Sequence, residues 1–182
     1  MPQVVSDAGP LIHLAQINKL CLLKKLFKQV IITPNVKLKA VDEGIRLDHS
    51  DAQIIGKAIE EGWVIVEDVP KNLASTIKRL AEDENISLAD AEALLFARDR
   101  KAEALVDDKA LSNLAKMFGL KTWSIWTVLL ESLRTDLIEV SEIESAIEEL
   151  GEKRHKLKKE QAAQILEAAK LIARKRKEKR ST

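Results

Sequence analysis

Short runs of β-branched or apolar residues alternate with amphipathic segments over residues 1–130, and this alternation restricts the fold more than any other feature. The runs have the length of strands, and the segments between them repeat apolar residues at helical spacing. Strands separated by helices indicate βαβ units, whose right-handed crossovers place helices on both faces of a sheet. We therefore expect an α/β fold with a mainly parallel central sheet, whose strands lie at 3–7, 29–33, 63–68, 103–108 and 120–126.

Individual residues indicate where helices begin and end. Pro34 suits the first turn of a helix, where its missing N–H costs little, and Gly44 is expected to end that helix. Ser50 and Ser141 each begin a pattern, Ser-x-x-Gln and Ser-x-x-Glu, that resembles a capping box. Ser87 is expected to cap the helix that follows it.

The aromatic and imidazole side chains have ordinary structural interpretations. His13 lies in an apolar helical stripe and is expected to be a half-buried structural residue. The last apolar run, if it is one strand, turns Trp123 and Trp126 to opposite faces of the sheet. One of the two tryptophans is then available for a dimer surface or for stacking on a base.

From residue 127 onward the pattern is helical only, which indicates a helical extension. We set the α/β domain at residues 1–130 and the helical extension, with its basic tail, at residues 131–182. A narrow apolar stripe in the extension requires a partner surface on the α/β domain, on a second copy or on another protein. This stripe consists of Ile165, Leu166, Ala169, Leu171 and Ile172.

The end of the chain is basic, whereas the rest is acidic. Residues 151–182 hold 12 Lys/Arg and 4 Asp/Glu, a net of +8, and residues 1–150 hold 18 and 25, a net of −7. A basic run of this kind is typical either of a solvated helix face or of contacts with RNA phosphates. The candidate RNA-binding residues are Arg174, Lys175, Arg176, Lys177, Lys179 and Arg180.

Composition excludes several classes of protein. No apolar run approaches the ~20 residues of a membrane span, so we expect no membrane association. The single cysteine, Cys21, excludes an internal disulfide and a cysteine-based zinc ribbon. The sequence begins without a basic signal-peptide region, and we expect a cytoplasmic protein. Charged residues make up 32% of the chain, a proportion typical of thermophile proteins.

Acidic residues follow the strand-like runs. Asp7 ends the first run, Asp107 and Asp108 end the fourth, and Asp90 lies near the start of the helix before it. The carboxyl ends of parallel strands share one edge, and several carboxylates there require a counter-charge. Mg²⁺ or Mn²⁺ suits such oxygen ligands. The alternative is that these acids are ordinary helix caps.

Four segments, in order, resemble motifs of PIN-domain nucleases, in particular small archaeal and bacterial PIN proteins related to VapC-type toxins. They are DAGPLIHLA at 7–15, VIITPNVKLKAVDEG at 30–44, LADAEALLFA at 88–97 and ALVDDKALSNLAKMFGLKTWSIWTVL at 104–129. The resemblance covers roughly residues 3–130. It implies a three-layer PIN-like domain, a Mg²⁺- or Mn²⁺-dependent endoribonuclease, a homodimer and, if the toxin likeness holds, a small antitoxin as partner.

The resemblance also assigns the metal acids. The first is Asp7, the third is Asp90, and the fourth is Asp108 with Asp107 beside it. Glu92 is a secondary candidate, because residues two apart on a helix do not share a face.

The second metal acid of the family is absent. Lys39 stands where the family carries Glu, and a cation there would compete with the metal for the carboxylates. Glu43 lies four residues later, on the same helix face, and could replace the missing ligand from one turn away. We expect catalytic and metal-binding roles for Asp7, Asp90 and Asp108, completed by Glu43.

Three functions remain open at this point. The first is a metal-dependent endoribonuclease of the PIN type that hydrolyses RNA phosphodiester bonds and could be the toxin of a toxin–antitoxin pair. The second, favoured by Lys39, is a catalytically degenerate PIN domain that binds RNA or protein. The third is an α/β regulatory domain of receiver-like topology, although that family requires an acidic pair early in the chain, which this sequence lacks.

Overall fold

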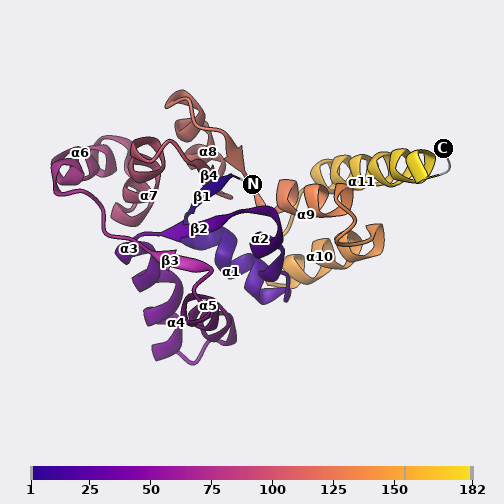
Figure 1. Ribbon diagram of the computed structural model, residues 1–182, viewed down its shortest axis with the longest axis horizontal. Helices are drawn as coiled ribbons and strands as arrows, with labels where there is room; N and C mark the ends of the chain where they lie inside the picture. Colours follow the sequence, from indigo (N-terminus) through magenta and orange to yellow (C-terminus); the bar gives the residue numbers. More distant parts are fainter. Residues whose placement is uncertain (1, 154, 181–182) are drawn as a thin grey trace. The chain divides into compact units, whose positions relative to one another are not determined.

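Strand β1 (Gln3–Ser6) is the central strand of a five-stranded sheet in the computed structural model, which describes residues 2–153 and 155–180 (Figure 1). Within these residues every strand pair is parallel, so the sheet is wholly parallel rather than mainly so. The strand order is β3-β2-β1-β4-β5. The other strands are β2 (Gln29–Ile32), β3 (Val64–Val66), β4 (Glu103–Leu105) and β5 (Thr122–Trp123).

Helices connect the strands and cover both faces of the sheet. Val4 and Val5 point to opposite faces and are 0% and 1% exposed, and Ile31 and Ile32 are both fully buried. Strands buried on both faces are the mark of an α/β sheet between two helical layers, as expected. The connecting helices are α1 (Ala8–Gln16), α2 (Cys21–Leu26), α3 (Pro34–Lys37), α4 (Glu43–Arg46), α5 (Ser50–Glu60), α6 (Ala74–Glu84), α7 (Leu88–Asp99) and α8 (Lys109–Met117).

The helix that follows β2 begins as expected but does not end at Gly44. Thr33 caps it by accepting a hydrogen bond from the Val36 N–H, and Pro34 occupies its first position. A π-helical turn, η1 (Leu38–Asp42), leads without a break into α4. Gly44 is buried inside α4, where a Cβ would lie 2.5 Å from the Cβ of Ala52. This glycine therefore allows α4 and α5 to approach closely, and it is no helix stop.

Three other local predictions are wrong. The run at 120–126 is a strand only at β5, and helix α9 (Ile125–Arg134) contains Trp126, so the two tryptophans do not share a strand. Helix α5 is capped from His49 without a side-chain hydrogen bond, so Ser50 begins no capping box. The capping box before helix α10 (Val140–Glu152) is formed by Glu139 and Glu142, two residues earlier than the pattern at Ser141 suggests.

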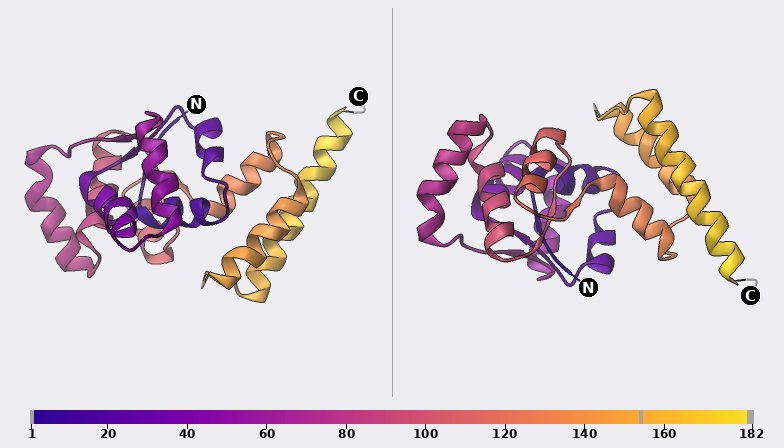
Figure 2. Two further views of the ribbon diagram at one scale, coloured as in Figure 1. Left: turned by 90° about the horizontal axis from the view of Figure 1, so that it is seen from below. Right: turned by 90° about the horizontal axis from the view of Figure 1, so that it is seen from above.

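The chain divides into two compact units, Met1–Ile125 and Trp126–Thr182, and the regular elements in the described residues of the second are all helices. Its longest helix, α11 (Lys159–Arg180), lies beside α10 (Figures 1 and 2). The apolar stripe therefore has a partner surface inside its own unit, with Ala169 fully buried and Ile172 half-buried. Within residues 2–153 and 155–180, no helix combines the length and apolar character needed to cross a membrane.

Candidate functional site

Asp7 lies at the carboxyl edge of the sheet, where β1 passes into α1. Its backbone N–H donates to the Leu105 carbonyl oxygen at 3.0 Å, so Asp7 extends the pairing of β1 with β4 by one residue. The residue is 6% exposed, and its side chain makes no capping hydrogen bond to α1. Its Oδ1 atom is buried without a hydrogen-bond partner. A buried carboxylate oxygen without a donor is costly, so a cation is the expected source of compensation.

Asp90 reaches the same place from the first turn of α7. A capping box with Ser87 fixes its position: the Ser87 N–H donates to Asp90 Oδ2, and the Asp90 N–H donates to Ser87 Oγ. Burial and then the nearby charge of Asp90 raise the pKa of Asp7 from 3.8 to about 6. Burial opposes ionisation of Asp90 as well, but the Ser87 hydrogen bond and a nearby lysine outweigh it and lower its pKa. The two carboxylates therefore form one interacting pair.

The lysine is Lys39, which the π-helical turn η1 presents to the acids. Its Nζ atom lies 3.3 Å from Asp90 Oδ1, and its charge lowers the pKa of both Asp7 and Asp90. The Lys39 side chain is 44% exposed, so water still reaches the ion pair. π-Helical turns occur frequently at functional sites. Lys39 stands at the position of the family's second metal acid, and it is thus in contact with Asp90, the third.

Glu43 does not join this group. It begins α4 and is exposed, and within the described residues its carboxylate makes no hydrogen bond or ion pair. A π-helical turn, which is wider than an α-turn, lies between Lys39 and Glu43, so the two residues are not spaced as in the regular α-helix that the sequence suggests.

The adjacent acids Asp107 and Asp108 have separate structural tasks. Asp107 Oδ1 accepts from the Ile125 N–H at 2.8 Å, and its Oδ2 lies 2.8 Å from Nδ1 of His13. Asp108 caps α8, with Oδ1 accepting from the Leu111 N–H at 2.8 Å, and is exposed. Asp107 has both oxygens engaged, whereas Asp108 keeps Oδ2 free of hydrogen bonds within the described residues.

Glu92 points to a different neighbour from Asp90. It is 9% exposed, and the Thr33 hydroxyl donates to its Oε2 atom at 2.7 Å. Thr33 follows β2 directly, so this contact connects α7 to the end of the neighbouring strand. Sequence reasoning placed Glu92 correctly off the face of Asp90 but did not identify Thr33. The available signal was a threonine immediately before Pro34, a common helix cap.

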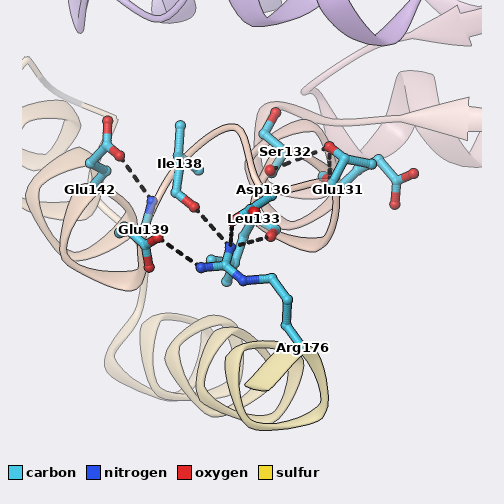
Figure 3. Close-up of polar contacts among 9 residues, drawn as sticks. Glu131, Ser132, Leu133, Asp136, Ile138, Glu139, Glu142 and Arg176 are labelled. Atoms are coloured by element: carbon cyan, nitrogen blue, oxygen red, sulfur yellow. Dashed lines mark hydrogen bonds and ion pairs between the residues drawn. The ribbon is translucent and has the colours of Figure 1, made fainter. Parts of the chain in front are cut away.

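Arg176, one of the candidate RNA-binding residues, is used inside the helical unit (Figure 3). Its Nη1 atom donates to the carbonyl oxygens of Leu133 at 2.9 Å and Ile138 at 3.4 Å. The same guanidinium pairs with Asp136 at 3.0 Å and with Glu139 at 2.7 Å. The side chain is 14% exposed. Arg176 therefore holds the turn between α9 and α10, and it is not a free phosphate contact.

The other basic residues of α11 are more accessible. Lys175 and Lys179 are exposed and line a cavity of about 400 Å³ together with Arg134 and Ile172. Arg174 lies 3.8 Å from Glu178 in an exposed pair, and Lys177 is exposed. The side chain of Arg180 lies outside the part of the chain that the structure describes.

A wholly parallel sheet with carboxylates converging at its carboxyl edge defines an α/β protein whose functional side is that edge. The model of the family described as DUF3368: PIN domain matches residues 3–171. The chain belongs to this PIN-domain family, which is typically one of metal-dependent nucleases. The match continues beyond the range of the sequence resemblance and includes α9, α10 and part of α11.

A solved structure with a TM-score above 0.5 has a similar fold. PAE2754 from Pyrobaculum aerophilum is 17% identical, with a TM-score of 0.53 over 71% of this chain and 94% of that chain. A PilT N-terminus domain protein, SSO1118 from the hyperthermophilic archaeon Sulfolobus solfataricus P2, is 22% identical, with a TM-score of 0.45 over 72% and 93%. No curated protein matches the chain.

Proposed function

We propose that the protein is a metal-dependent endoribonuclease, with Asp7 and Asp90 as the central metal ligands. One observation carries the proposal: Oδ1 of Asp7 is buried at the sheet edge without a hydrogen-bond donor, beside a second carboxylate. A group in this position gains more from a cation than from water. Two neighbouring carboxylates match the ligand preference of Mg²⁺ and Mn²⁺ for oxygen donors.

Asp108 is the third proposed ligand. It follows β4, the strand paired with β1, and only one of its oxygens is used to cap α8. We assign Asp107 a structural role, since its Oδ1 accepts from the Ile125 N–H and its Oδ2 contacts His13. Glu43 is exposed and makes no hydrogen bond or ion pair within the described residues, so we do not place it among the ligands.

The bound cation would supply an ionised water and stabilise the charge that develops on the scissile phosphate. The residues of the chain have complementary tasks. Asp7 and Asp90 hold the cation, and Ser87 fixes the orientation of Asp90 through two hydrogen bonds. Lys175 and Lys179, which are exposed on α11, provide positive charge for an RNA backbone that the acidic sheet edge repels.

A second function, in which the domain binds RNA or protein without cutting, is favoured by Lys39. The ion pair of Lys39 with Asp90 gives the site an internal cation in place of a metal. Cleavage of a mixed RNA pool in Mn²⁺, with wild type beside Asp7→Asn, separates the two functions. Loss of a metal-dependent cut in Asp7→Asn supports the nuclease, whereas equal residual activity in both proteins assigns the cut to a contaminant.

The antitoxin partner and the homodimer implied by the family resemblance belong to the same proposal. Leu38, Ile45 and Leu47 are about half exposed or more, at 48%, 52% and 62%, and lie on the segment that carries Lys39. An antitoxin that blocks the acidic edge would cover these side chains. The mass of the protein alone in solution tests the homodimer. The same measurement with the product of the neighbouring gene tests that product as the antitoxin.

A further inference from the structure

A cavity of about 290 Å³ opens on the same edge of the sheet as Asp7 but over different strands. Its apolar wall includes Val69, Pro70 and Leu88, and its polar groups include Asn35 and Glu92. Lys71 lies at its rim and is exposed. The volume is at the lower end of the range for ligand pockets, which suits one ring system better than a large cofactor.

The position of this cavity follows from the sheet. Thr33 comes directly after β2, and it holds Glu92 at 2.7 Å. β2 is paired with β1, so the end of β2 lies about 4.8 Å along the edge from the end of β1, where Asp7 lies. Val69 and Pro70 come after β3, the next strand. The cavity therefore lies one or two strands along the edge from Asp7 and Asp90. An extended RNA chain can cross the strand ends in the same direction.

The polar groups of the cavity select by hydrogen-bond type. Glu92 is more than nine-tenths buried, and an ionised carboxylate only accepts hydrogen bonds. Thr33 already satisfies Oε2, which leaves the remaining acceptor capacity for a ligand N–H. Asn35 can both donate and accept. An apolar wall, one acceptor and one adaptable amide together match the face and edge of a nucleobase.

We propose that this cavity binds one base of a single-stranded RNA whose backbone crosses the acidic edge, and that it prefers bases with an exocyclic amine over uracil. The choice of RNA rests on the proposed function. Glutamate accepts readily from the cytosine amine, and adenine and guanine also carry amines. Uracil presents carbonyl oxygens on both sides of its single N–H, and these oxygens repel the Glu92 carboxylate.

The test measures binding without cleavage. Fluorescently labelled oligocytidine and oligouridine pentamers are titrated in EDTA against wild type, Glu92→Gln, Ala74→Phe and Glu82→Gln. Wild type should bind oligocytidine about tenfold more tightly than oligouridine, the discrimination expected from one good hydrogen bond to a base edge. In Glu92→Gln, the amide oxygen can keep the Thr33 contact while its NH₂ group faces the cavity. The preference should then disappear or reverse toward uracil.

The other variants isolate the cavity from general charge effects. Ala74→Phe adds bulk at the exposed rim of the cavity and should weaken both oligonucleotides. Glu82→Gln removes the same charge from an exposed position of α6 that is not part of the cavity lining, so it should keep the wild-type preference. Thermal melting of each variant verifies that the protein is folded.

The outcomes distinguish this proposal from the nuclease proposal. A cytidine preference that depends on Glu92, in a protein that cuts no RNA, supports the base site and refutes the nuclease. Metal-dependent cleavage with equal affinity for the two pentamers, or with a preference that survives in Glu92→Gln, overturns the base site and leaves the nuclease standing.

Discussion

The Nζ atom of Lys39 lies 3.3 Å from Oδ1 of Asp90, so a residue of the π-helical turn η1 neutralises one acid of the candidate metal site. The other acid of the pair, Asp7, keeps a buried oxygen without a hydrogen-bond donor. The site therefore has one carboxylate that is compensated within the protein and one that is not. This asymmetry determines how the site should respond to pH, to metal and to substitution.

Asp7 is expected to make the metal-free protein less stable as the pH rises. Its pKa is about 6 in the folded state against 3.8 in an exposed carboxyl, so the folded state holds the proton more tightly. The free energy of unfolding therefore falls as the pH rises from about 4 to 6. Above that window the loss amounts to roughly 3 kcal/mol. Urea denaturation from pH 3.5 to 8 should show wild type losing stability relative to Asp7→Asn across this window. A constant difference across the range contradicts the raised pKa.

Saturating Mn²⁺ should reverse this relation. A cation binds the ionised form of Asp7 in the folded protein only, so it stabilises wild type by mass action but not Asp7→Asn. The same denaturation series at pH 7.5, with and without Mn²⁺, checks this outcome. Stabilisation of Asp7→Asn to the same extent would locate the cation elsewhere.

Lys39→Glu is expected to tighten Mn²⁺ binding by about tenfold or more, because it removes a competing cation and adds a ligand. Lys39→Met, which removes only the charge, should give a smaller gain. Calorimetric titration of both variants and wild type measures the two contributions. Glu43→Gln should leave the affinity unchanged, and a loss in that variant would show that Glu43 serves as the replacement ligand after all.

Asp107→Asn is expected to act on stability rather than on metal affinity. It weakens the contacts to the Ile125 N–H and to His13, which should cost about 1–3 kcal/mol. Asp108→Asn, in contrast, keeps an acceptor for the Leu111 N–H but loses a charged ligand, so Mn²⁺ affinity should fall. Denaturation and Mn²⁺ titration of the matched pair separate the two roles. The reverse pattern would exchange the assignments of these neighbours.

Arg176→Ala is expected to destabilise the helical unit by about 2 kcal/mol, because it removes one donor from two carbonyl groups and from two carboxylates. The matched control is Arg174→Ala, since Arg174 makes only an exposed pair. Lys175→Ala with Lys179→Ala should leave stability unchanged and flatten the salt dependence of RNA binding. If RNA affinity is unchanged when the two lysines are replaced but is lost in Arg174→Ala, the RNA contact lies on the other face of α11.

The sequence predicted most of the sheet because its signals are local. Runs such as 3–7 and 103–108 indicate buried strands, and the acids that end them lie at one edge of a parallel sheet. Pro34 and Ser87 begin helices where they were expected, because capping depends on a few adjacent residues. The position of Lys39 beside the acids followed from the family resemblance, because Lys39 stands where the family carries its second metal acid.

The remaining errors concern residues whose roles depend on distant parts of the chain. Gly44 looked like a helix stop until Ala52 was seen to lie against it. Asp107 was expected only as a neighbour of Asp108 in the metal site, and its contacts with the Ile125 N–H and His13 were not foreseen. Arg176 looked like a member of a solvated basic run, yet its partners lie about forty residues earlier. None of these partners can be inferred from spacing.

Arg176 also lies five residues beyond the end of the family match at residue 171. A chain trimmed to that boundary would keep α9, α10 and most of the apolar stripe but would lose the guanidinium that binds their connecting turn. Amide hydrogen exchange should then accelerate around Leu133–Glu139, far along the sequence from the cut. The end of the family match and the end of the cooperatively folded unit are thus different residues, and the Arg176 side chain accounts for the difference.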